Sequence, residues 1–126
     1  VRRHWYKNGE QQAKFRMGNG LKNGYGRTWY SNGTLATIYS YREGKEDGLC
    51  QVFNKDGKMT QKFTKKNGDY HGIYQHFYDD GKRHIRCRMR NGMRNGKTKQ
   101  WYKTGALQMK YFSKNNKREG VFKEWH

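Results

Sequence analysis

The chain has 126 residues, with 28 Lys and Arg against 10 Asp and Glu and a formal net charge of +18. Hydrophobic residues make up only 32% of it, against about 45–50% in an average globular chain, whereas aromatic residues reach 16%. This composition excludes a large aliphatic core and predicts one small domain or short repeat array with a thin aromatic core. The charge predicts partners with acidic surfaces.

Hydropathy and the start of the chain bear on localisation. No stretch approaches the roughly 18 apolar residues of a membrane-spanning helix. Because the chain begins with Val1 rather than Met, we expect that an upstream segment was removed. The sequence assigns no cellular compartment.

Glycines and large aromatic residues recur every 24 residues without insertion or deletion, which predicts one supersecondary unit repeated in register. The glycine columns are Gly9, Gly33, Gly57, Gly81 and Gly105, then Gly24, Gly48, Gly72, Gly96 and Gly120, then Gly20, Gly44, Gly68 and Gly92. The aromatic column is Trp5, Trp29, Phe53, Phe77, Trp101 and Trp125. We therefore divide the single array 1–126 into a partial unit 1–24, full units 25–48, 49–72, 73–96 and 97–120, and a partial unit 121–126.

Each unit is predicted to be a β-hairpin. In chain order it has a segment such as 25–30, a tight turn, a segment such as 35–42, and a Gly-x-x-x-Gly connection. The turns contain Asn-Gly, Asp-Gly or Thr-Gly, which favour hairpins because Gly accepts a positive φ. The fold class predicted is all-β: tandem 24-residue hairpins forming an elongated, twisted, antiparallel single-layer sheet.

Alternation along the second segments assigns the two faces. A type I turn with a Gly bulge pairs Trp29 with Leu35 and is expected to place both on one apolar face, whereas a two-residue turn would pair Trp29 with Ala36. The predicted core side carries Leu35, Thr37, Tyr39 and Tyr41, then Met59, Gln61 and Phe63, then Ile85, Cys87 and Met89, then Leu107, Met109 and Tyr111.

The other side of the second segments collects basic residues in two columns, predicted to be binding ladders. One column is Lys14, Lys62, Arg86 and Lys110, interrupted by Ile38; the other is Arg42, Lys66, Arg90 and Lys114, interrupted by Gly18. Arg88 lies between Arg86 and Arg90, inside the stretch 81–118, which contains 13 basic residues and no acidic one. At the hairpin rim, Tyr30, Tyr78 and Tyr102 are candidates for stacking on bases.

A family resemblance rests on a pattern that recurs along the chain. It is seen as Gly24, Trp29, Tyr30, Asn32, Gly33 and Leu35, and again as Gly96, Trp101, Tyr102, Gly105 and Leu107. This pattern resembles MORN-type repeats, most closely the 24-residue variant of bacterial YwqK-like antitoxin proteins, and it covers the whole chain. The resemblance implies a sheet of tandem hairpins used mostly for binding proteins, with membrane or phospholipid contact in some members. The chain departs from the pattern at Asn54, Arg83, Lys97 and His126, and it is more basic than the usual member.

Catalytic and metal-binding patterns are nearly absent from the sequence. No serine has a nucleophile-elbow context, most acids fall in turns, and we expect no enzyme activity, cofactor or metal. His71, His76 and His84 belong to one unit, where they could approach one another, but no carboxylate is predicted to orient them. Cys50 and Cys87 should lie three strands apart, about 14 Å, which exceeds the roughly 7 Å reach of a disulfide, so free thiols are predicted.

The sequence predicts two possible binding functions, and a third interpretation assigns the basic face no binding role. The leading one is a non-enzymatic scaffold, antitoxin- or immunity-like or a complex subunit, whose basic face meets an acidic protein. The alternative is that the ladders follow a nucleic acid or an anionic membrane, with tyrosine stacking. A basic face can also merely keep a thin sheet soluble and protect its edges. The oligomeric state is left open.

Overall fold

The structure, a computed structural model, describes residues 1–124 and the side chains of residues 1–117. It has thirteen strands in one sheet. They are β1 (Arg2–Trp5), β2 (Gln11–Gly18), β3 (Leu21–Trp29), β4 (Leu35–Arg42), β5 (Lys45–Glu46), β6 (Gly48–Phe53), β7 (Met59–Lys66), β8 (Asp69–Tyr70), β9 (Gly72–Phe77), β10 (Arg83–Arg90), β11 (Met93–Trp101), β12 (Leu107–Lys114) and β13 (Lys117–Glu124). Trp125 and His126, which belong to the predicted partial unit 121–126, lie outside the described residues.

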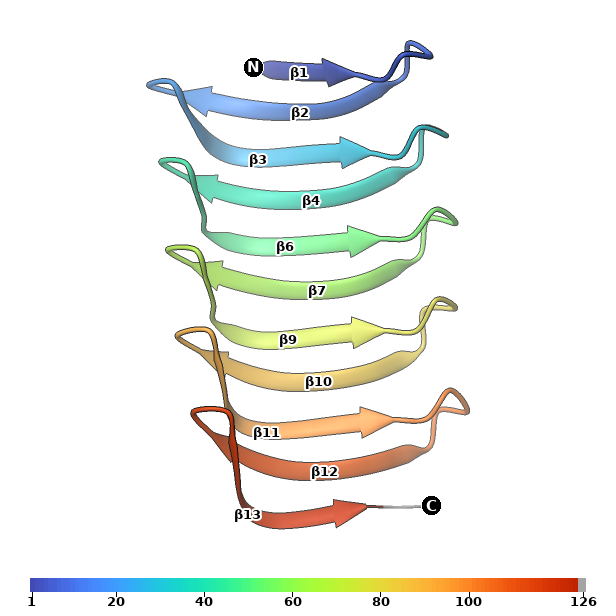
Figure 1. The fold of residues 1–126 in the computed structure, drawn as a ribbon, viewed down its shortest axis with the longest axis vertical. Helices are drawn as coiled ribbons and strands as arrows, with labels where there is room; N and C mark the ends of the chain where they lie inside the picture. The colour runs from blue at the N-terminus through green and yellow to red at the C-terminus, as the bar shows by residue number, and fades with distance from the viewer. Residues whose placement is uncertain (125–126) are drawn as a thin grey trace.

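The strands follow one another in chain order as a single curved antiparallel layer (Figure 1). The short strands β5 and β8 pair with β4 and β7 beside this path. The predicted all-β, single-layer sheet of tandem hairpins is therefore confirmed. Because the long strands pair in the order in which they follow one another along the chain, the sheet is built by repetition of one local unit.

The tight turns have the predicted bulged geometry. In the turn after β3, the Gly33 amide donates to the Tyr30 carbonyl at 3.0 Å and the Tyr30 amide donates to the Thr34 carbonyl at 2.8 Å. Gly33 has φ +87°, the left-handed conformation that a type I turn with a glycine bulge requires. Trp29 pairs with Leu35, as predicted.

The Gly-rich connections between units are also tight turns. Asn19 and Gly20 have φ of 52° and 79°, and the corresponding residues in the other connections also have positive φ. Two consecutive residues of this kind are typical of a type I′ hairpin turn. The chain therefore reverses between successive long strands, and the result is a continuous meander.

A second bulge lies next to each tight turn and changes the assignment of faces. In the β3–β4 pair, the register shifts between Thr28 and Trp29, so that Thr28 pairs with Thr37 and Ala36 is the extra residue. A bulged residue and its successor lie on the same side of the sheet. The prediction that Leu35, Met59, Leu107 and Trp29 share one face with Thr37 and Tyr39 is thus wrong, because the bulge moves them to the opposite side, where Trp101, the equivalent of Trp29, is only 6% exposed.

The core lies on one face, here called the core face, and is formed by rows of side chains that run across the strands. Aromatic rings alternate with small residues along much of its central row. Phe63 is 2% exposed, stacks on Tyr74 with ring centroids 5.7 Å apart, and meets the edge of Tyr39 at 5.8 Å. The central row consists of Phe15, Gly26, Tyr39, Cys50, Phe63, Tyr74, Cys87, Thr98 and Tyr111.

Candidate binding surface

The opposite face, here called the basic face, carries a row of mostly cationic residues that runs from β1 to β12. Backbone pairing connects each residue of the row directly to the next, so neighbours are about 4.8 Å apart. Seven of the ten residues are Lys or Arg, and none is acidic. The row, here called the basic row, is Arg3, Lys14, Arg27, Ile38, Gln51, Lys62, Gln75, Arg86, Lys99 and Lys110.

The bulges beside the tight turns create this row. Without the bulge at Ala36, Arg27 would face Thr37 and would project with the core residues. With it, Arg27 pairs with Ile38 and lies on the basic face. The same shift brings Lys99 between Arg86 and Lys110.

The structure brings together most of the site residues predicted from sequence. Lys62, Arg86 and Lys110 belong to the basic row. Arg88 lies on the same face two residues from Arg86, and it pairs with Ile73. The second predicted ladder, Arg42, Lys66, Arg90 and Lys114, lies on the same face at the connection ends of its strands.

Sequence reasoning missed the basic residues of the first strands of the hairpins. Arg3, Arg27 and Lys99 were not assigned to a ladder, although they alternate with the second-strand cations. The signal in the sequence was their 24-residue spacing, since Arg3, Arg27 and Lys99 occupy the same column of the repeat. Their face depended on the second bulge, which no local pattern indicates.

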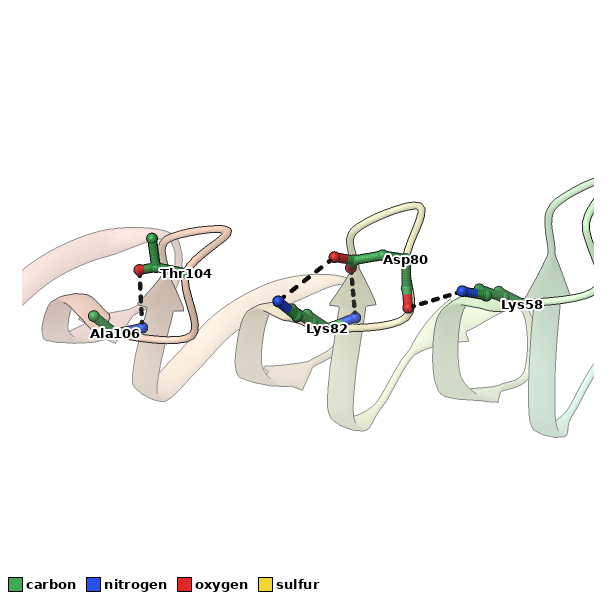
Figure 2. Close-up of polar contacts among 5 residues, drawn as sticks. All are labelled: Lys58, Asp80, Lys82, Thr104 and Ala106. Atoms are coloured by element: carbon green, nitrogen blue, oxygen red, sulfur yellow. Dashed lines mark hydrogen bonds and ion pairs between the residues drawn. The ribbon is translucent and has the colours of Figure 1, made fainter.

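In the part of the chain whose side chains are described, no carboxylate forms an ion pair with a residue of the basic row. That part forms two ion pairs, Lys65 with Glu46 at 2.7 Å and Lys82 with Asp80 at 4.0 Å, and neither includes a residue of the row. Asp80 belongs to a tight turn, where its carboxylate also accepts a hydrogen bond from the Lys82 amide at 2.9 Å (Figure 2). The turns thus hold this acid at the rim of the sheet.

The tyrosines predicted for stacking connect one repeat to the next. The Tyr30 hydroxyl donates to the Phe53 carbonyl at 2.6 Å, and the Tyr78 hydroxyl donates to the Trp101 carbonyl at 2.7 Å. Tyr102 is half-buried in the next equivalent position. Where Asn54 replaces tyrosine, its amide donates to the Asp79 carbonyl at 3.0 Å. These hydrogen bonds hold the hairpin ends in a fixed step; stacking on bases stays a prediction.

Two of the three candidate histidines meet at the end of β9. The Nδ1 atoms of His76 and His84 are 3.0 Å apart, and the His84 ring stacks on Tyr78 with centroids at 4.3 Å. His71 lies just before the opposite end of β9. Burial, and to a lesser extent the nearby His76, lower the pKa of His84, which favours the neutral ring. Within the described residues, no group of three or more His, Cys, Asp or Glu side chains is placed to hold a metal ion.

Both cysteines are free thiols, as predicted. Cys50 on β6 and Cys87 on β10 are separated by β7 and β9 and are almost completely buried. Burial is the main cause that raises the pKa of each thiol, so both stay protonated near neutral pH. They act as small core residues between the aromatic rings.

Comparison with known families supports the repeat assignment. Residues 70–91, which include β9 and β10, match the family described as MORN repeat variant. No curated protein matched the chain. The stretch of 22 residues runs from the end of unit 49–72 through most of unit 73–96, and the other units repeat its strand and turn geometry. Residues 1–124 contain no helix that is long and apolar enough to cross a membrane.

Proposed function

We propose that the chain is a non-catalytic repeat scaffold whose basic face binds an acidic surface of a protein partner. The observation that carries this proposal is the basic row, with cations that are direct cross-strand neighbours. Arg86, Lys99 and Lys110 follow one another at about 4.8 Å, well within the Debye length of about 8 Å at physiological salt. Their fields therefore add.

Stability and solubility alone do not favour this arrangement. Like charges directly opposite each other on neighbouring strands destabilise a sheet by about 0.2–1 kcal/mol per pair. Solubility is served equally well by a surface of mixed sign. A row that keeps one sign despite this cost supports a role in binding an anionic surface.

The MORN resemblance favours a protein as that partner. An antitoxin-like, immunity-like or complex-subunit role is the form of protein binding that the resemblance implies, and we retain it within the proposal. The competing reading, a polyanion such as single-stranded DNA, draws support from the density of charge along the row.

The test separates binding from folding by reversing two charges. Lys14 lies between Arg3 and Arg27, and Lys99 lies between Arg86 and Lys110. In the double variant Lys14→Glu/Lys99→Glu, each new carboxylate gains two cross-strand cations. We expect higher stability by about 0.5–1 kcal/mol, together with at least roughly tenfold weaker binding of fluorescein-labelled poly-glutamate at 100 mM salt.

A control variant matches the net charge. Lys7 and Lys103 are exposed in tight turns, away from the row, so Lys7→Glu/Lys103→Glu should bind poly-glutamate within about twofold of the value expected from net charge alone. Equal loss in both variants would refute a defined binding face. A salt slope of about −4 or steeper for single-stranded DNA, with binding retained at 150 mM salt, would favour the polyanion reading instead.

A further inference from the structure

Three exposed apolar side chains occupy the same position in consecutive repeats on the basic face. Tyr25, Leu49 and Ile73 are 57%, 40% and 40% exposed. Each lies two residues before a member of the basic row on its strand. We name these three residues the apolar stripe.

The register gives the stripe its geometry. Neighbouring members are two strands apart, about 9.5 Å, and the whole stripe runs parallel to the basic row at about 6.7 Å. Ser40 lies opposite Tyr25, and Thr64 lies opposite Leu49. Small polar side chains thus separate the three large apolar ones along the sheet.

The stripe is bordered by cations on both sides. The basic row supplies Arg27, Lys62 and Arg86 on the side of the tight turns. On the connection side, Arg42 and Lys66 lie on the same face, at the ends of β4 and β7. An exposed apolar patch with a polar rim is typical of a protein interface, whereas apolar residues scattered singly need no explanation.

Resting on the proposed function above, we propose that the partner's binding element is an amphipathic α-helix with an acidic flank, which lies along the apolar stripe. Residues seven apart on one face of a helix are about 10.5 Å apart, close to the roughly 9.5 Å between neighbouring members of the stripe. Over the two steps of the stripe, the difference between the helix and the sheet adds up to about 2 Å. Carboxylates on the flank of such a helix then face Arg27, Lys62 and Arg86.

The chemistry of the stripe favours a protein segment over a nucleic acid. Bases stack on planar side chains, and Leu49 and Ile73 have branched aliphatic side chains with no planar surface. Aliphatic side chains instead bury against the apolar edge of a helix, a recurring mode of peptide recognition.

The experiment uses a synthetic probe: a 21-residue peptide of three heptads with Leu at the a and d positions, Glu along one flank and Gln elsewhere. The control peptide has the same composition in scrambled order. Binding is measured by fluorescence anisotropy at 100 mM salt. We expect the patterned peptide to bind at least tenfold more tightly than the scrambled one.

Variants of the protein test the stripe itself. Leu49→Ser/Ile73→Ser should weaken binding of the patterned peptide about tenfold and leave its salt dependence unchanged, because no charge is altered. Leu21→Ser/Met93→Ser is the matched control, since both side chains are exposed at connections between units, outside the stripe. It should bind within twofold of the natural chain.

The outcomes separate this inference from the proposed function. If Leu49→Ser/Ile73→Ser binds the patterned peptide as tightly as the natural chain, or if both peptides bind equally, the helix inference is wrong while the basic-face scaffold stands. If Lys14→Glu/Lys99→Glu leaves poly-glutamate binding unchanged, the proposed function itself fails. Binding to phosphatidylserine vesicles that depends on Leu49 and Ile73 would overturn the inference in favour of a lipid surface.

Discussion

Gly26 lies under an aromatic ring at the centre of β3, and we predict that Gly26→Ala destabilises the sheet. A Cβ at this position would clash with Phe15 Cδ1 and would lie 3.0 Å from Tyr41 Cε2. The Phe15 ring cannot withdraw freely, because the Tyr41 ring packs on its edge with centroids 5.9 Å apart and Lys22 Nζ lies 3.8 Å above it.

Two terms set the size of the effect. Overpacking a filled site costs about 1–3 kcal/mol, and the Gly-to-Ala change returns about 0.4–1 kcal/mol by restricting the unfolded chain. The net loss should be about 1–2 kcal/mol. In urea this lowers the midpoint by roughly 0.5–1 M with an unchanged slope, and in a thermal scan it lowers Tm by roughly 4–10 °C.

The assay is urea unfolding followed by tryptophan fluorescence, with a second substitution to relieve the clash. Phe15→Leu removes the ring, so the double variant Gly26→Ala/Phe15→Leu should be more stable than the sum of the single changes predicts, by at least about 1 kcal/mol. Gly18→Ala is the control, because its nearest neighbour is the side chain of the exposed residue Asn23 at 3.3 Å. Strict additivity, or equal effects at Gly26 and Gly18, would refute this account of the core.

Three further predictions concern single side chains. Thr98 is 1% exposed and its hydroxyl has no hydrogen-bond partner in the described structure. Thr98→Val should therefore raise the free energy of unfolding by about 1 kcal/mol, measured as a higher urea midpoint. A loss of stability would reveal a partner for the hydroxyl. Tyr78→Phe removes the hydrogen bond to the Trp101 carbonyl and should lower the free energy of unfolding by about 0.5–1.5 kcal/mol. It should also speed amide hydrogen exchange in the adjacent turns. An unchanged exchange pattern would show that this contact does not join the repeats. Because the pKa of His84 is lowered in the folded state, the unfolded chain binds more protons, so stability should fall as the pH drops from about 6.5 through the lowered pKa. Urea midpoints measured at about pH 5 and 7.5 check this, and His84→Gln should reduce the difference between the two midpoints. An equal difference in the natural chain and in the variant would assign the pH dependence to other groups.

Much of the fold follows from local chemistry that one repeat already contains. A glycine such as Gly33 after Asn32 predicts a tight turn because a left-handed conformation is needed there. Alternation of aromatic and polar residues along 35–42 separates the two sides of a strand, and it correctly placed Thr37, Tyr39 and Tyr41. The spacing of 24 residues then implies that neighbouring hairpins lie in register.

The candidate site could be predicted only in part. The second-strand cations Lys62, Arg86 and Lys110 were found because alternation along one strand is enough to place them on one face. Lys99 was not found, because its face depends on where the first strand meets its partner. The apolar stripe escaped notice for the same reason.

The sequence by itself determined the repeat, the turns and the residue types available to each face. Only the tertiary structure decided how the two strands of a hairpin register, because the extra residue at each bulge, such as Ala36, has no mark in local composition and becomes visible only through cross-strand pairing. That single-residue shift places Trp29 on the side opposite Thr37 and brings Arg27 into line with Ile38, since the side-chain period of a strand is two and a shift of one exchanges its faces.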